Sequence, residues 1–393
     1  MKRAFLFLLA VIFISCDNEG IREVELDNDG SEITKRAFKI NLSKPGDHYL
    51  KIVNKQEKSV SFKMIFNGNR IYGTLNDIIK DIKKMPDEYS GEPIVRKVWR
   101  YTIDNSRHDK PLTDSAFYHI PQIFFNSTGF GFCDDRSMVN NFIWRKLGYE
   151  SQVWGLGNHV VSEVKVDGKW EMYDSMQEVY YMNNDGKVAS VEEIIKDPDI
   201  ILKPNDPIIE FNDDVPKPYS YDVMMCYMHP DAYTVIPELP DITFQSAIYL
   251  GPGYYVQFPK VNDPVLMTAT INDSKEKPQP IEEYANFLYC ITNSSNGVIP
   301  FPFLIHSIEG NGVVSFDQKT YYEAGSKKLE EKINNWDEFN YPVFFNSRDS
   351  LKLNYILNPE RFSLKKENTL LLIGKNIDSL EVLLLKDVSE KAN

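Results

Sequence analysis

Cysteine is scarce in this chain: its 393 residues include four, at Cys16, Cys133, Cys226 and Cys290. Zinc sites built on cysteine use closely spaced pairs or mixed His/Cys clusters. Neither occurs here, so we expect no metal site, and nothing in the sequence requires an organic cofactor. The spacing of Cys226 and Cys290 supports no particular disulfide bond.

Basic residues are also few. The chain has 44 Lys and Arg against 57 Asp and Glu, a formal net charge of −13 at pH 7. Nucleic-acid phosphates and anionic lipid headgroups repel a protein of this sign. We therefore exclude a function that depends on binding DNA or RNA.

Long apolar runs are confined to the first residues. Ala4–Ile14 is unbroken, follows Lys2 and Arg3, and is too short to span a bilayer as a helix. Small Ser15 then precedes Cys16, which completes the layout of a secretory signal. No later stretch reaches spanning length, so we expect no transmembrane helix.

The same residues resemble a bacterial lipoprotein signal, in which the cysteine is lipidated and becomes the new N-terminus. The resemblance implies that a lipid on Cys16 anchors the protein to a membrane of the cell envelope. The alternative is an ordinary cleavage site with a chance thiol. Asp17 does not decide whether the anchor lies in the inner or the outer membrane. Removal of residues 1–15 takes away two basic residues and no acid, leaving 42 against 57 and a net charge of −15.

Apolar periodicity divides the rest of the chain into β-rich and helical parts, so the predicted fold class is α+β. Pro and Asp are frequent at 197–220, which marks a boundary. The predicted order is a signal peptide with lipidated Cys16 at 1–16, a flexible tether at 17–36, an N-terminal β segment at 37–74, a helical and β core at 75–196, a linker at 197–220 and a C-terminal β-rich domain of sandwich type at 221–393.

The stretch 131–175 contains the candidate chemistry. Apolar residues recur at helical spacing over 133–147, which predicts a helix that begins at Cys133. The helix dipole favours a thiolate at that end, the form of cysteine that attacks a carbonyl carbon. Asp134 and Asp135 add negative charge nearby and oppose the thiolate, so a histidine partner is needed.

A predicted hairpin downstream supplies that histidine. Asp167-Gly168 is a strong two-residue turn signal. Counting outward from it places His159 and Asp174 diagonally on one face, about 7 Å apart at the backbone. A carboxylate there can hold one imidazole nitrogen and direct the other toward a sulfur. The opposite face, with Val164 and Tyr173, is expected in the core, which leaves the His159 face to meet the cysteine helix.

Three motifs in this order resemble the transglutaminase-like superfamily, over about residues 75–195. They are GFCDD at a helix start, NHVVSEV at a strand start and GKWEMYD at a strand end. The resemblance implies a papain-like core in which Cys133 is the nucleophile, His159 the base and Asp174 the orienting acid, with a peptide or protein as substrate. Trp99 resembles an aromatic packing residue of the preceding helix.

Two functions from different classes follow. The first is a membrane-anchored thiol enzyme that forms a thioester on Cys133; hydrolysis of amides or peptides is favoured over amine transfer, because bacterial relatives are often proteases or amidases. The second is an inactive surface scaffold that binds a glycan or a protein through the C-terminal β-rich domain, where 251–258 is aromatic. The reactivity of Cys133 distinguishes the two functions: it depends on His159 in the enzyme and does not in the scaffold.

Overall fold

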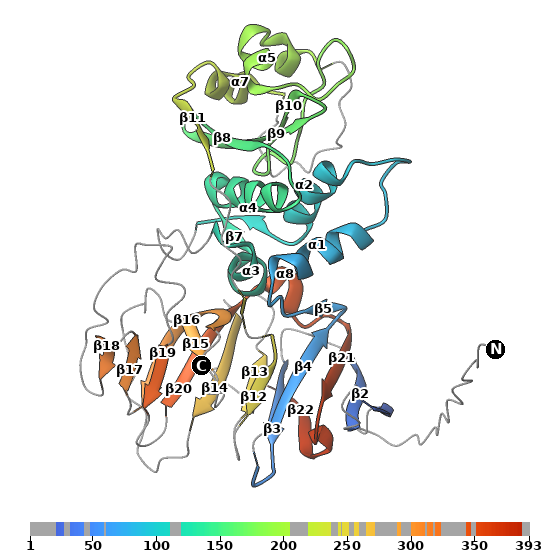
Figure 1. The fold of residues 1–393 in the computed structure, drawn as a ribbon, viewed down its shortest axis with the longest axis vertical. Helices are drawn as coiled ribbons and strands as arrows, with labels where there is room; N and C mark the ends of the chain where they lie inside the picture. The colour runs from blue at the N-terminus through green and yellow to red at the C-terminus, as the bar shows by residue number, and fades with distance from the viewer. Residues whose placement is uncertain are drawn as a thin grey trace, which may run out of the picture.

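Helices and strands are mixed in the structure, in agreement with the predicted α+β class. A helical upper part stands on a strand-rich lower part (Figure 1). No helix in the described part of the chain is both long and apolar enough to cross a membrane. The computed structural model describes residues 21–26, 32–42, 48–58, 60–110, 119–204, 219–236, 243–244, 246–250, 255–258, 265–271, 289–291, 300–310, 313–316, 319–323, 343–346 and 351–386; the signal at 1–16, with Cys16, lies outside them.

The upper part is built on a four-stranded antiparallel sheet in the order β10-β9-β8-β11. Helices cover both of its faces (Figure 1). The strands are β8 (Ser151–Leu156), β9 (His159–Val166), β10 (Lys169–Tyr173) and β11 (Ala232–Val235). One face packs on α1 (Leu75–Lys84), α2 (Ile94–Asp104) and α4 (Cys133–Lys146), and the other on α5 (Val191–Lys196), α6 (Asp199–Leu202) and α7 (Tyr221–Tyr227).

Local sequence signals form these helices as predicted. Thr74 caps α1: its side chain accepts a hydrogen bond from the Asp77 amide, and the Asp77 carboxylate binds back to the Thr74 amide. The apolar residues of α1 at helical spacing are buried. α4 ends just before Gly148, whose φ of +90° lies in the left-handed region that favours glycine.

The β9–β10 hairpin has the predicted register. Val166 pairs with Lys169 and Glu163 with Met172. Asp167 and Gly168 form the turn with φ values of +48° and +81°, as a two-residue hairpin turn requires. Asp174 lies just beyond β10 and forms an isolated bridge with Val179, so it leaves the ladder instead of pairing with β9.

The prediction that α4 meets the His159 face of the hairpin is wrong for the body of the helix; its first residue, Cys133, does interact with His159. Val164 and Tyr173 share a buried cluster with Val139 and Trp144 of α4. The His159 face, represented by Val161, packs instead with α5, α6 and α7. Both faces of the hairpin carry apolar side chains, so each needs a cover of helices.

The lower part joins strands from the two ends of the chain, which the sequence analysis had placed in separate segments, 37–74 and 221–393. Pairing between them supplies partners for backbone groups that would otherwise lie on open sheet edges. β21 (Glu367–Gly374) lies between β2 (Glu32–Asn41) and β4 (Val60–Phe66), and β3 (His48–Asn54) lies between β13 (Tyr255–Phe258) and β22 (Leu380–Lys386).

Two predicted boundaries also change. Residues 21–26 of the expected tether form β1 (Ile21–Leu26), which pairs antiparallel with β2; its polar composition hid a strand whose side chains at 22–24 are exposed. The linker at 197–220 begins with α6, and its residues 205–218 lie outside the described ones. α7 and β11 follow it and still belong to the upper part, which therefore extends to about residue 236.

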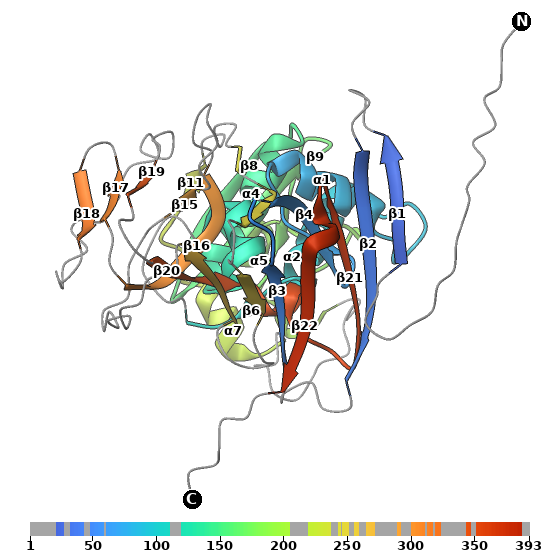
Figure 2. The same cartoon turned by 90° about the horizontal axis from the view of Figure 1, so that it is seen from below.

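Short elements connect the two parts, and further strands extend the lower one (Figure 2). The aromatic stretch of the expected glycan site is described only over 255–258, as β13. The other elements are β5 (Asn69–Arg70), β6 (Arg107–His108), α3 (Pro121–Ile123), a π-helical turn (Phe124–Thr128), β7 (Phe130–Gly131), β12 (Ile248–Leu250), β14 (Val265–Ile271), β15 (Tyr289–Ile291), β16 (Pro300–Gly310), β17 (Val313–Phe316), β18 (Lys319–Glu323), β19 (Val343–Asn346), β20 (Leu351–Leu357), α8 (Pro359–Phe362) and a 3₁₀ turn (Ile377–Ser379).

Candidate active site

Cys133 is the first residue of α4 and is partly exposed, at a helix N-terminus as predicted. Phe132 precedes the helix in extended conformation, and its amide donates a hydrogen bond to the Asp135 carboxylate at 2.8 Å. One turn into α4, Ser137 Oγ donates to the Val160 carbonyl at 3.3 Å. This contact sets the start of α4 beside the start of β9, where His159 lies.

His159 and Asp174 are in direct contact. The distance from His159 Nε2 to Asp174 Oδ2 is 2.6 Å, and both side chains are buried. Because Nε2 faces the carboxylate, the other ring nitrogen, Nδ1, is left for a partner on the opposite side of the ring. The pairing that hairpin register predicted between these two residues is thus present.

Asp174 is held from several sides. Its second carboxylate oxygen, Oδ1, accepts hydrogen bonds from the amides of Met176 and Gln177, each at 2.9 Å. Trp99 Nε1 donates to the Asp174 carbonyl at 3.0 Å. Trp99, expected only to pack, therefore also fixes the backbone of the orienting acid, and the carboxylate has no freedom to turn away from His159.

The charge of His159 follows from these contacts. Burial by itself would lower its pKa, but the charge of Asp174, the hydrogen bond to it and the hydrogen bond with Cys133 outweigh burial and raise the pKa to about 10. At neutral pH the ring is therefore an imidazolium between a carboxylate and a sulfur. Such a ring can stabilise a thiolate and later give its proton to a leaving group.

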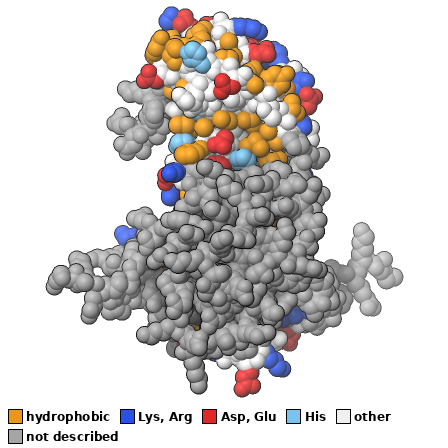
Figure 3. All heavy atoms as spheres, turned by 90° about the vertical axis from the view of Figure 1, so that its left-hand side faces the viewer, with side chains coloured by type: hydrophobic (Ala, Val, Ile, Leu, Met, Phe, Trp, Pro, Cys, Tyr) orange, Lys and Arg blue, Asp and Glu red, His pale blue; other side chains and the backbone are white. Residues whose placement is uncertain are grey.

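The surface around Cys133 is partly apolar. Seen from the left-hand side of Figure 1, the described surface of the upper part carries hydrophobic side chains beside histidine and acidic ones (Figure 3). Phe132 is 38% exposed, and the His108 ring lies 5.9 Å from its ring centre. Burial, then the charges of Arg136 and His159, lower the pKa of His108, so His108 is neutral at pH 7.

His119, Asp134 and Asp135 form a second polar cluster beside Cys133. Among the described residues these side chains come nearest to the geometry of a metal site, with ligand atoms within 4.8 Å of one another. Asp135 already caps α4, and His119 Nε2 lies 3.3 Å from its other oxygen. These contacts are those of a helix cap and an ion pair, so we do not assign the three as metal ligands.

Cys226 is the other described free thiol. Its Sγ donates to the Asp222 carbonyl at 3.5 Å within α7, and burial raises its pKa. A disulfide at this position, for which the spacing gave no support, is absent from the described structure. Cys226 therefore serves as an internal reference for the reactivity of Cys133.

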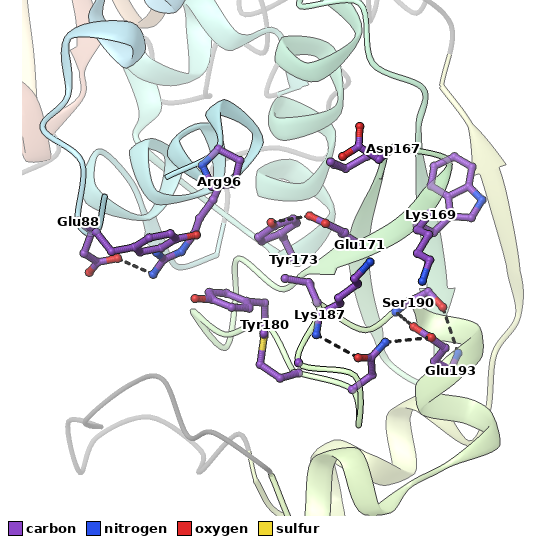
Figure 4. Close-up of a pocket in the computed structure, with 18 residues that line it drawn as sticks. Glu88, Arg96, Asp167, Lys169, Glu171, Tyr173, Tyr180, Lys187, Ser190 and Glu193 are labelled. Atoms are coloured by element: carbon purple, nitrogen blue, oxygen red, sulfur yellow. Dashed lines mark hydrogen bonds and ion pairs between the residues drawn. The ribbon is translucent and has the colours of Figure 1, made fainter. Parts of the chain in front are cut away.

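A cavity of about 890 Å³ lies on the α2 side of the hairpin and does not include the triad (Figure 4). Arg96 lies between the rings of Tyr89 and Tyr180, at 4.7 and 5.0 Å from their centres. On another wall of the cavity, the Tyr173 hydroxyl donates a hydrogen bond to the Glu171 carboxylate at 2.9 Å. Tyr173 lines the cavity, but the next residue, Asp174, does not. The cavity is therefore separate from the candidate active site.

Replacing Glu171 with glutamine is expected to stabilise the protein at neutral pH. Burial raises the pKa of Glu171, so its ionised form is disfavoured in the folded state. The resulting penalty is absent at low pH, where the group is protonated in both states, grows as pH rises above the unfolded pKa, and is complete once pH exceeds the folded pKa. We expect Glu171→Gln to raise the melting temperature by a few degrees at pH 7, with the gain disappearing toward pH 4.

The exposed Glu57→Gln is the matched control, with no comparable change in melting temperature expected. Equal melting temperatures for Glu171→Gln and the unaltered protein at both pH values would contradict the buried, ionised carboxylate.

In comparisons with known proteins, the chain matches no protein-family model, no curated protein and no solved structure. Its function therefore rests on the geometry of the site. Sequence analysis named the three triad residues and took Trp99 for a packing residue, but it did not single out His119. The position of Trp99 on the preceding helix was a signal in the sequence. His119 gave no such signal, because no spacing rule connects position 119 with α4.

Proposed function

We propose that this protein is a thiol enzyme whose catalytic residues are Cys133, His159 and Asp174. The observation that carries the proposal is the 2.6 Å contact of His159 with Asp174, in a ring that also interacts with Cys133 at the start of α4. A nucleophile, a base and an orienting carboxylate in series are the arrangement of acyl-transfer catalysis. The ordered motifs that resemble the transglutaminase-like superfamily contain the same three residues.

In the first half-reaction the Cys133 thiolate attacks the carbonyl carbon of an amide, and a C–S bond forms. The amide of Cys133, at the first position of α4, has no helical acceptor and donates to the oxyanion. The C–N bond then breaks, and the imidazolium of His159 gives its proton to the departing amine. A thioester on Cys133 and a neutral His159 remain.

In the second half-reaction His159 accepts a proton from water as the water oxygen attacks the thioester. The C–O bond forms, the C–S bond breaks, and the carboxylic acid leaves. Thiolate and imidazolium are restored, with Asp174 holding the ring in place throughout. An amine that replaced water would give transfer instead; we propose hydrolysis of a peptide or protein, the outcome that the family resemblance favours.

We also propose that the upper part is a papain-like core and that the mature protein is lipid-anchored in the cell envelope through Cys16. The order of a cysteine helix, a strand that begins at the histidine and a strand that ends just before the aspartate supports the first statement. The basic start, apolar run and Ser15-Cys16 junction support the second. The lower part, with strands from both ends of the chain, is proposed as a β-sandwich that presents the core.

Acylation by p-nitrophenyl acetate tests the proposed chemistry without a known substrate. The expected result is rapid release of p-nitrophenolate and an acetyl thioester on Cys133, found by peptide mass spectrometry. Cys133→Ala should lower the release rate by about 100-fold or more, because the attacking group is gone. Cys226→Ala is the matched control and should behave as the unaltered protein. Equal release by the two variants would contradict the assignment of Cys133.

A further inference from the structure

We infer that His119 is a positioning residue for the proposed thiol chemistry: it holds both first-turn carboxylates of α4 and cancels part of their charge beside Cys133. The inference rests on the proposed role of Cys133 as nucleophile. It answers the difficulty that Asp134 and Asp135 raise, since two carboxylates next to a sulfur disfavour its thiolate.

The cluster is formed by segments that are separate in the chain. His119 lies before α3, outside α4, and its Nε2 is 3.3 Å from Asp135 Oδ1 and 3.9 Å from Asp134 Oδ2. The Asp135 side chain is 6% exposed, that of His119 20% and that of Asp134 50%. The ion pair is therefore shielded from water on the Asp135 side, where charge acts most strongly.

Asp135 has no freedom to move its charge away from the sulfur. One of its oxygens caps α4 through the Phe132 amide. A Cβ at Gly131 would lie 2.7 Å from the Asp135 carboxylate, so the side chain is packed closely against this backbone. The carboxylate is thus required by the helix start, and its charge has to be balanced from outside α4.

His119 supplies that balance as an imidazolium. Burial would lower its pKa, but hydrogen bonds and charge attraction from Asp134 and Asp135 outweigh burial and raise the pKa to about 9. The interaction with His119 in turn lowers the pKa of Asp134. At pH 7 the cluster carries one net negative charge instead of two, and this compensation is lost as pH rises through 9.

Other charged and titratable groups approach the site from the elements packed around it. His159 on β9 is an imidazolium paired with Asp174 after β10. His108 on β6 is neutral at pH 7, and buried Arg136 on α4 lies 3.6 Å from Glu178. His159 and Arg136 are paired with other carboxylates, and His108 is neutral. We therefore assign the balancing of the charge of Asp134 and Asp135 to His119.

The test is the rate of iodoacetamide alkylation of Cys133 against pH, measured by mass spectrometry in the unaltered protein, His119→Gln, and His119→Gln with Asp134→Asn. We expect His119→Gln to lower the rate at pH 6 by about 3- to 10-fold, because the charge of the two carboxylates beside the sulfur is then uncompensated. Asp134→Asn in addition removes one carboxylate and should restore most of the rate. The exposed His229→Gln is the matched control and should leave the profile unchanged.

An unchanged profile in His119→Gln overturns the inference, and so does a lower rate that Asp134→Asn does not restore, because that pattern is a loss of structure. Should His119→Gln fail to fold, Asp134→Asn alone gives the answer: a faster alkylation at pH 6 supports the inference and no increase overturns it. If Cys133 of the unaltered protein reacts no faster than Cys226, the proposed function itself fails and the inference with it.

Discussion

His159→Ala is expected to lower the alkylation rate of Cys133 at pH 6 by about 100-fold or more. In the unaltered protein His159 remains an imidazolium at this pH, since its pKa is raised to about 10, and its charge faces the sulfur. Removal of the ring leaves the helix dipole and His119 to favour the thiolate, against Asp134 and Asp135. The reacting thiol is then mostly protonated and slow.

The measurement uses iodoacetamide and peptide mass spectrometry between pH 5 and 9, with Cys226 as the internal reference. His229→Ala controls for the loss of a histidine elsewhere, because His229 is exposed. An equal rate in His159→Ala and the unaltered protein would remove His159 from the triad. Circular dichroism of the variant shows whether a lower rate comes from chemistry or from unfolding.

Arg361→Ala is expected to lower the free energy of unfolding by about 3 kcal/mol or more. Arg361 lies on α8, between the upper and lower parts, and is 1% exposed. It donates to the Phe125 carbonyl at 3.0 Å and the Arg70 carbonyl at 2.8 Å, and stands over the Tyr72 ring at 4.1 Å. Truncation leaves buried carbonyl groups unpaired and opens a cavity, each of which is costly.

Urea unfolding monitored by tryptophan fluorescence measures this loss. Arg22→Ala is the matched control: Arg22 also connects distant parts of the chain, through Asp378 at 2.7 Å, but both side chains are about half exposed. Exposed ion pairs contribute little to stability, so a much smaller loss is expected. Similar losses for the two variants would contradict the interpretation of Arg361 as a buried connection.

The intact chain is needed for any test of the scaffold alternative. Deletion of residues 221–393 would remove β21 from between β2 and β4, and β22 from beside β3. It would also remove α7 and β11 from the upper part. Loss of binding after such a deletion would therefore report unfolding as readily as a missing partner site, whereas point variants of Cys133 keep both parts whole.

The elements that the sequence predicted depend on short-range signals. The helix that begins at Cys133 follows from apolar spacing, and the hairpin follows from Asp167-Gly168 and the alternation on either side of it. Counting residues outward from the hairpin turn then predicts the contact of His159 with Asp174. Each step links positions at most 15 residues apart, so the chain itself limits how they can be arranged.

The sequence analysis failed where a contact joins positions that no local rule connects. β1 was taken for a tether because it lies in an acidic, polar stretch with little periodicity, and β21 was placed in a separate domain although it pairs with β2, more than 300 residues earlier. His119 had no recognisable partner, since its two carboxylates lie on a helix that begins after a π-helical turn and a short strand. Both faces of the hairpin are apolar, and the pattern could not say which helices cover which.

By itself, then, the sequence determined which three residues are proposed as the triad, the helix that begins at Cys133 and the register that brings His159 to Asp174. These are local matters of turn, cap and periodicity. Only the tertiary structure decided that α4 packs on the Val164 and Tyr173 face, that His119 pairs with Asp134 and Asp135, and that Arg361 joins the two parts. The physical reason is that burial and charge pairing depend on which distant surfaces meet, and that is a property of the packed chain as a whole.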